Sequence, residues 1–294
     1  CDLSGADLSG ANLSYANLTN ANLSGADLTD AVLLGATAPR ADFSSASLVS
    51  TTFINADLRS SNLSHSLLRN VTFNGATLSD ADLDFSDVRS TSFVGADLTN
   101  ADLSEASLSD VDFTSADLRG VDATGVDFSD AAVTAARFEN ADLSGANFTG
   151  LDLTAIAFTR ADATGARFVS ARMARANLSG VNLTDTSLLK ADLSHTKQAG
   201  ATWHNTVCPD GLVTTGAPCP GTAVNEAGFL PIGAIPYRFH VDRDGGSPAH
   251  DIEYTTTPVN LFYEYQPVDA SVAAEADAPL FIMLNGGPCL LYTS

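Results

Sequence analysis

The sequence predicts an all-β fold whose larger part, residues 1–200, is a four-sided solenoid. Three observations predict it: a five-residue unit repeats without insertion or deletion, its third residue is apolar, and its phenylalanines recur at twenty-residue intervals. A five-residue period fits neither an α-helix, which repeats every ~3.6 residues, nor a single strand, which alternates about every two. The chain must therefore turn once in every unit, so that each unit forms one side of a coil.

The repeat begins "CDLSG ADLSG ANLSY ANLTN" and runs through forty consecutive pentads, from Cys1 to Gly200. The third residue is Leu in 23 pentads, Phe in 10, and Val, Ala or Met in six, and Gln198 is the single polar exception. The first residue is Ala in 25 pentads and is otherwise almost always small or β-branched. We expect these two positions to face the core, and the second and fourth, rich in Asp, Asn, Ser and Thr, to face solvent.

The spacing of the central phenylalanines predicts how many pentads close one coil. Nine of the ten fall into three series with a twenty-residue interval: Phe53, Phe73, Phe93 and Phe113; Phe128, Phe148 and Phe168; Phe138 and Phe158. Four pentads per coil would place each residue next to the one twenty positions later, and aromatic rings could then stack in columns. Three pentads per coil would not align them.

This pattern resembles the pentapeptide-repeat family, whose unit is Ala-(Asp/Asn)-Leu-x-x, over about 200 residues. The resemblance implies a right-handed quadrilateral β-helix, here of about ten coils. Cys1 opens a pentad in register and is not a Met, so we expect the natural N-terminus to be missing. A lipid-modified N-terminal cysteine is the alternative.

The chain is acidic, with 14 Lys and Arg against 35 Asp and Glu and a formal net charge of −21. Nucleic acids and anionic membranes bind surfaces whose Lys and Arg replace counterions, so we expect no nucleic-acid partner. No run of about 18 apolar residues predicts a membrane span. His65 and His195 stand at outward positions without metal-ligand spacing, and we expect no metal and no cofactor.

Seventeen pentads have Asp in the second position. We interpret these carboxylates as a solvated face that keeps the solenoid soluble and protects its edges from pairing. The family resemblance gives the alternative, because some members are thought to mimic DNA and bind topoisomerases.

Residues 201–227 are predicted to form a cap and a linker. Trp203 takes the third pentad position and is large enough to cover an open end of the solenoid. Cys208 and Cys219 bracket a loop rich in Pro and Gly, and similar Cys-Pro-Asp-Gly segments follow the repeats in other bacterial family members. We expect a disulfide between them, with free thiols as the alternative; a disulfide implies an extracytoplasmic or secreted location.

Residues 228–288 have a different composition, with larger, alternating side chains. "NLFYEYQPV" is typical of a strand, and "APLFIMLNGGP", residues 278–288, predicts a buried strand that ends in a tight glycine turn. Together they resemble the serine carboxypeptidase family of α/β-hydrolases, whose hallmark is Leu-Asn-Gly-Gly-Pro-Gly. We therefore expect the opening strands of a truncated hydrolase domain.

The hydrolase resemblance implies roles for three residues. The backbone N–H groups of Gly286 and Gly287 are oxyanion-hole candidates, and Asn285 is a candidate for holding the substrate's terminal carboxylate. The family usually has Trp where Met283 stands. The nucleophile, Asp and His would all follow this loop, so no catalytic residue can be assigned and this chain is expected to be inactive.

The last six residues, 289–294, read "CLLYTS". TGT CTC TTA TAC ACA TCT, a transposase adapter used in sequencing, encodes the same six residues. We expect this segment to be adapter translation, which removes Cys289 as a nucleophile.

The sequence therefore favours a non-catalytic scaffold or protein-interaction rod, attached to an incomplete secreted peptidase-like domain. One alternative is a fragment of a serine-type carboxypeptidase whose triad lies further along, with a peptide substrate only for the complete parent. The other is an acidic DNA mimic that binds a topoisomerase.

Overall fold

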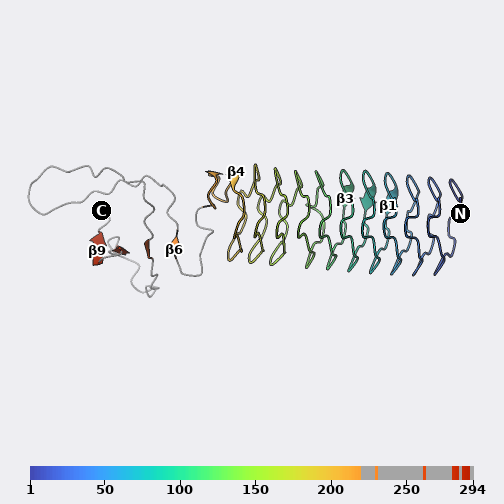
Figure 1. Ribbon diagram of the computed structural model, residues 1–294, viewed down its shortest axis with the longest axis horizontal. Coiled ribbons are helices and arrows are strands. Elements are labelled where there is room, and N and C mark those ends of the chain that lie inside the picture. The colour runs from blue at the N-terminus through green and yellow to red at the C-terminus, as the bar shows by residue number, and fades with distance from the viewer. Residues whose placement is uncertain (220–228, 231–260, 263–279, 285–286, 292–294) are drawn as a thin grey trace, which may run out of the picture. The chain divides into compact units, whose positions relative to one another are not determined.

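The computed structural model describes residues 1–219, 229–230, 261–262, 280–284 and 287–291. The chain divides into two compact units, Cys1–Cys219 and Pro220–Ser294. The first unit is a parallel β-helix of stacked coils (Figure 1), and the described residues contain strands but no helix. The predicted all-β class therefore holds for the part of the chain that the structure describes.

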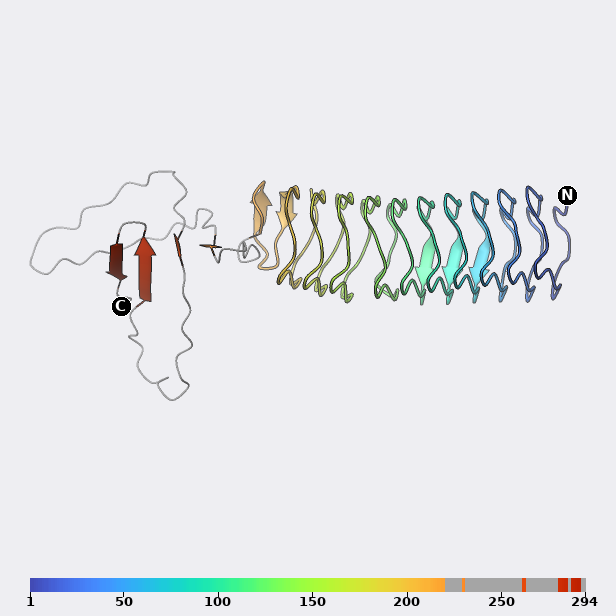
Figure 2. The same cartoon turned by 60° about the horizontal axis from the view of Figure 1, so that its bottom comes forward.

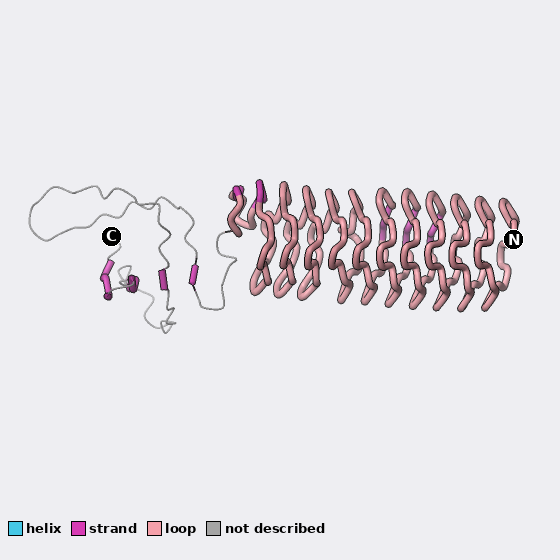
Figure 3. The backbone as a smooth tube through the Cα atoms, in the orientation of Figure 1, coloured by secondary structure: helices cyan, strands magenta, loops and turns pink. Residues whose placement is uncertain are grey.

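Each coil of the first unit is four pentads long. The second residue of a pentad pairs in parallel with the residue twenty positions later, from Asp2 with Asn22 to Ser187 with Val207. The twenty-residue register thus continues past residue 200. Figure 3 shows the result as a regular series of loops of equal width.

The backbone of one pentad shows why five residues suffice for one side. In residues 21–25, the Ala21 N–H donates to the carbonyl three residues earlier and turns the corner. The Asn22 N–H donates to the preceding coil, and those of Leu23 and Gly25 donate to the next coil. The Ser24 N–H faces no carbonyl and donates to the side chain of Asn22, at 3.1 Å. All five donors are satisfied, as a stable backbone requires.

The corners lie at the fifth residue, which adopts a left-handed backbone. Every fifth residue from Gly5 to Asn205 except Asp130 has a positive φ, between 50° and 77°. Gly, Asn and Asp tolerate this region best, and they occupy many of these positions. Four aromatic residues also stand at these corners: Tyr15, His65, Phe85 and His195.

The core lies inside the coils and is built from the first and third residues of each pentad, as predicted. The phenylalanine columns stack: ring centroids are 5.1 Å apart for Phe53 and Phe73, and 4.8 Å for Phe128 and Phe148. These separations match the ~4.8 Å spacing between neighbouring strands. The prediction of twenty-residue columns is therefore confirmed.

On one side of the β-helix, three successive coils run straight enough to form short strands: β1 (Leu67–Arg69), β2 (Asp87–Arg89) and β3 (Ser107–Ser109). They pair in parallel in the order β1-β2-β3, with Leu68, Val88 and Leu108 in one row. Figure 2 shows them as three arrows on successive coils.

The end of the first unit is an antiparallel pair, β4 (His204–Val207) and β5 (Val213–Thr215). Trp203, which immediately precedes β4, is 2% exposed. The Thr206 hydroxyl donates to the Leu183 carbonyl at 2.7 Å, which ties β4 to the coil before it.

Four strands are described in the second unit: β6 (Phe229–Leu230), β7 (Leu261–Phe262), β8 (Leu280–Leu284) and β9 (Gly287–Leu291). They form one antiparallel sheet in that order. β8 coincides with the strand predicted before the glycine turn. Most of residues 228–288, the expected hydrolase segment, lies outside the described residues.

Candidate interaction surface

The second pentad residue has a structural role that the sequence analysis missed. Its side-chain oxygen accepts the N–H of the fourth residue, the one donor that finds no carbonyl. Of the 24 Asp and Asn residues at this position, 23 make this bond, at 2.8–3.3 Å. The exception, Asp87, lies in β2 and binds Arg69 and Arg89. These residues are therefore built-in turn caps as well as solvated acids.

Asp122 offers a clean test of the cap. Its Oδ1 accepts the Thr124 N–H at 3.0 Å and the Thr124 hydroxyl at 2.8 Å. Replacement by Ala leaves that N–H without its partner and is expected to reduce the free energy of unfolding by about 0.5–2 kcal/mol. Replacement by Asn, the residue at positions 62 and 182 of the same face, should cost less than half as much. Chemical denaturation of both variants decides, and equal losses would contradict the cap.

One of the four sides of the β-helix carries Asp or Asn at the second position in every coil. We call it the aspartate face and define it by these residues: Asp2, Asn22, Asp42, Asn62, Asp82, Asp102, Asp122, Asp142, Asp162 and Asn182. Neighbours in this row pair directly, so five successive carboxylates, from Asp82 to Asp162, follow at the strand spacing of about 4.8 Å. The pentads of this face contain no Lys or Arg.

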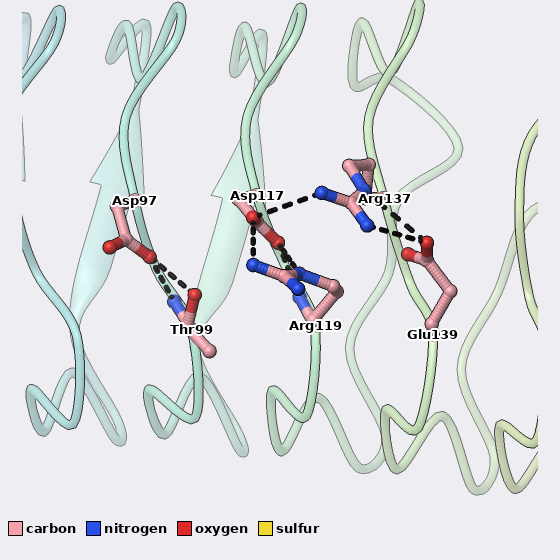
Figure 4. Close-up of polar contacts among 6 residues, drawn as sticks. All are labelled: Asp97, Thr99, Asp117, Arg119, Arg137 and Glu139. Atoms are coloured by element: carbon pink, nitrogen blue, oxygen red, sulfur yellow. Dashed lines mark hydrogen bonds and ion pairs between the residues drawn. The ribbon is translucent and has the colours of Figure 1, made fainter.

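On a neighbouring side, some carboxylates are neutralised by arginines. Figure 4 shows Asp117 between Arg119, at 2.6 Å, and Arg137, at 3.5 Å, while Arg137 also reaches Glu139 at 2.9 Å. Beside them Asp97 accepts only the hydroxyl and N–H of Thr99. Among the ion pairs of the described residues, none involves the aspartate face. The ion pairs are thus confined to the other three sides, and no arginine in the described ranges neutralises a carboxylate of the aspartate face.

The hydrogen bonds that the second-position carboxylates accept on all sides of the β-helix predict that acid destabilises the fold. The pKa of Asp7 and of Asp152 is lowered from the ordinary 3.8, first by the hydroxyls of Ser9 and Thr154 and then by their N–H groups. Because folding lowers these pKa values, their stabilisation is present above about pH 4 and is lost as the pH falls through the folded values. Melting temperatures should be constant from pH 7 to 5 and fall below pH 4. A constant melting temperature down to pH 2.5 would contradict this.

Asp84, in a pentad of the aspartate face, is in an unfavourable environment for a charged carboxylate. Burial, and then the charge of Asp82, raises its pKa, and its Oδ1 is buried without a hydrogen-bond partner. Serine stands at this place in the coils on either side, at Ser64 and Ser104.

We expect Asp84→Ser to stabilise the fold by about 0.5–2 kcal/mol at pH 7, because it removes a half-buried carboxylate that lies beside Asp82 and has one oxygen without a hydrogen-bond partner. A carboxyl whose folded pKa is raised costs stability above its unfolded value of 3.8, and most above its folded value, so the gain should be smaller at pH 4 than at pH 7. Denaturant titrations at pH 7 and pH 4 measure it, with the exposed Asp30→Ser as control. Destabilisation at pH 7 would refute the argument.

An exposed aromatic pair borders the aspartate face. The rings of His65 and Phe85 stack with centroids 5.2 Å apart and an interplanar angle of 9°. Both lie at the corner where the aspartate face ends, and Phe85 is 54% exposed. His65 was predicted to be an isolated outward residue; it is outward but not isolated, because the twenty-residue register brings Phe85 beside it. The spacing of the two residues would have revealed the pair.

The structure joins Cys208 and Cys219 by a disulfide, with Cα atoms 5.4 Å apart. Cys208 stands at a third pentad position and is fully buried. The turn between them is closed by the Cys208 N–H, which donates to the Leu212 carbonyl at 2.7 Å.

The hydrolase candidates remain predictions. Gly287 is the first residue of β9 and pairs with Leu284, whereas Asn285 and Gly286 lie outside the described residues. Cys289 falls within β9, in the segment expected to be adapter translation.

Within the described ranges, no group of three or more His, Cys, Asp or Glu side chains is arranged to hold a metal ion. We also find in them no helix with the length and apolarity that a bilayer crossing requires.

The family model for pentapeptide repeats matches the chain with 8 copies between residues 1 and 197. A solved pentapeptide-repeat protein, HetL of the cyanobacterium Nostoc sp. strain PCC 7120, involved in the regulation of heterocyst differentiation, is 29% identical. The match covers 72% of this chain and 87% of that one, with a TM-score of 0.44.

A thylakoid-lumen pentapeptide-repeat protein of Arabidopsis thaliana is 32% identical over 32% of this chain and 63% of its own, with a TM-score of 0.23. Full-length QnrB1, a plasmid-mediated fluoroquinolone resistance protein, is 19% identical over 68% and 92%, with a TM-score of 0.25. No curated protein matches the chain.

Proposed function

Because the chain belongs to the pentapeptide-repeat family, we propose that residues 1–219 are a non-catalytic protein-interaction rod whose aspartate face binds a basic protein surface. One observation carries the proposal: ten successive second positions are Asp or Asn on a side without a single Lys or Arg. The 12 Lys and Arg residues of the repeats all stand on the other three sides. Seven of the ten residues are Asp and three are Asn, so this side carries negative charge that no Lys or Arg of its own pentads neutralises.

The geometry suits an extended partner. The carboxylates are held in a row by the backbone register, and each is fixed by hydrogen bonds from the fourth residue of its pentad. The Asp102 Oδ1, for example, accepts the N–H and the hydroxyl of Ser104 at 2.8 and 2.6 Å. A rigid row of like charges steers and orients a complementary surface and loses little entropy on binding.

A displayed library of random peptides, selected on the immobilised full chain, tests this proposal. We expect enrichment of Lys- and Arg-rich peptides. Their affinity should fall at least about tenfold for a triple variant Asp102→Asn, Asp122→Asn and Asp142→Asn, which keeps the turn caps but removes three charges. The matched control, Asp7→Asn, Asp27→Asn and Asp127→Asn, removes three charges from another side. Equal losses in both triple variants, or no enrichment, would remove the proposal.

An acidic mimic of DNA that binds a topoisomerase is the second candidate, and the same row of carboxylates favours it. The forty pentads have no inserted loop, which the family's mimics tend to carry. This candidate predicts that the chain inhibits gyrase supercoiling at micromolar concentration. No inhibition there would eliminate it.

For residues 228–288 we propose the start of a serine carboxypeptidase-like domain, supported by the sequence "APLFIMLNGGP" after "LFYEY". Its oxyanion-hole residues would be Gly286 and Gly287, with Asn285 on the substrate carboxylate. The rod would then display or target a secreted peptidase, and the disulfide at Cys208 supports an extracytoplasmic site. Sequencing the parent gene past codon 288 tests this: Gly-x-Ser-x-Gly with later Asp and His would support it, and an early stop codon would refute it.

A further inference from the structure

The exposed aromatic pair of His65 and Phe85 presents a large apolar surface to solvent, which neither the core nor the solubility of the β-helix requires. Phe85 is a large apolar side chain, more than half exposed, on a left-handed backbone with φ of 50°. Two coils on, the same corner carries Gly125, whose left-handed backbone has no side chain to strain. Glycine adopts this backbone at less cost than a residue with a side chain. Neither the corner nor the exposure therefore favours a large ring at this position.

The surroundings of the ring are acidic. Glu105 stands one coil further along the same corner, and Asp84 immediately precedes the ring in the chain. Asp82 and Asp102 continue the aspartate face beside it, and they pair with each other in the register. On the other side of the corner, the arginines nearest in sequence, Arg69 and Arg89, are both engaged by Asp87. The ring thus lies among carboxylates that form no ion pair within the described residues.

We propose that the His65–Phe85 pair, with Asp84 and Glu105, is a docking site for an arginine side chain of the basic partner. A guanidinium stacks on an aromatic face and donates to carboxylates at the same time, which a lysine ammonium does less well. Charge complementarity selects this occupant: an apolar partner would bury several carboxylates without compensation. The proposal rests on the proposed function of the aspartate face and names the anchor point on it.

The chain supplies its own matched control in Tyr15. Tyr15 is also an exposed aromatic at a fifth pentad position, with φ of 59°, and it lies over Gly35 in the next coil. The pentads of its side carry no charged residue before Asp112. Substitution of Tyr15 therefore removes an exposed ring that has no acidic neighbours on its own side.

The test is the binding of fluorescein-labelled hexa-arginine to the full chain, followed by anisotropy. Phe85→Asn should weaken binding about fivefold, Phe85→Tyr should keep it, and Tyr15→Asn should change it less than twofold. Hexa-citrulline, which keeps the shape without the charge, should not bind. Asn suits the left-handed corner, so Phe85→Asn should melt no lower than the parent.

Three outcomes would overturn the site. Equal affinity of the Phe85→Asn variant and the parent would mean that the face attracts cations by charge alone. Equal affinity for hexa-lysine and hexa-arginine in every variant would remove the selectivity for a guanidinium. A dimer in light scattering that Phe85→Asn dissociates would make a second copy of this chain the occupant. In the first case the triple Asp→Asn variant would still lose binding, so the interaction rod would stand while this site falls.

Discussion

Replacing Phe148 by alanine is expected to lower the free energy of unfolding by about 3–5 kcal/mol. Phe148 is fully buried, and its ring stacks on Phe128 and Phe168 with centroids 4.8 and 5.0 Å away. It also meets Phe138 and Phe158 edge-on, at 5.7 and 6.0 Å. The cavity would interrupt a continuous column of rings, and the rigid coils above and below cannot close on it. Guanidinium denaturation measures the loss.

The control for this variant is Phe148→Leu. Leucine occupies the same column at Leu108 and Leu188, so the backbone accepts it, and the loss should stay below about 1.5 kcal/mol. In a solenoid each coil contacts only its neighbours, so a severe lesion can also split the unfolding transition into two. A loss below 1 kcal/mol for Phe148→Ala, with an unchanged single transition, would contradict the packing described here.

Removal of the Cys208–Cys219 disulfide is the second large effect, with an expected loss of about 3 kcal/mol. The bond closes a short segment, with 11 residues of sequence separation, and holds β4 and β5 over the end of the core. The double variant Cys208→Ala and Cys219→Ala avoids leaving a single thiol. The stability loss should appear in denaturant titrations.

Reduction of the parent protein provides the control, because dithiothreitol should reproduce the loss in the parent and leave the double variant unchanged. Amide hydrogen exchange should show faster exchange for residues 204–215, with the central coils unaffected. If oxidised and reduced parent unfold at the same denaturant concentration, the disulfide does not secure the end of the β-helix.

The fold of the first unit could be predicted because one rule repeats. The identity of the third residue and the twenty-residue spacing of Phe53, Phe73 and Phe93 together specify an inward row and the number of pentads per coil. Both signals are apolar, and burial makes apolar patterns reliable. The left-handed fifth residue was not predicted, because Ser, Arg and Ala stand there as well as Gly and Asn.

The candidate surface was harder to predict, since it depends on which outward residues become neighbours. The second-position Asp residues were interpreted as solvated, and their bonds to the fourth-residue N–H need the turn geometry before they can be seen. His65 and Phe85 are twenty residues apart, and only the coil register makes them a pair. Arg137 likewise binds Asp117 across one coil, so its positive charge neutralises a carboxylate of its own side.

The four-sided register also determines which changes in length the surface can survive. A deletion of one whole coil would shorten the rod and leave every remaining residue on its side. A deletion of a single pentad, such as residues 91–95, would rotate everything after it by one side. Asp82 and Asp102 would then lie on adjacent sides, and the continuous row of carboxylates would become two shorter rows that face different directions. The aspartate face is therefore continuous only because the forty pentads follow one another without an insertion or a deletion.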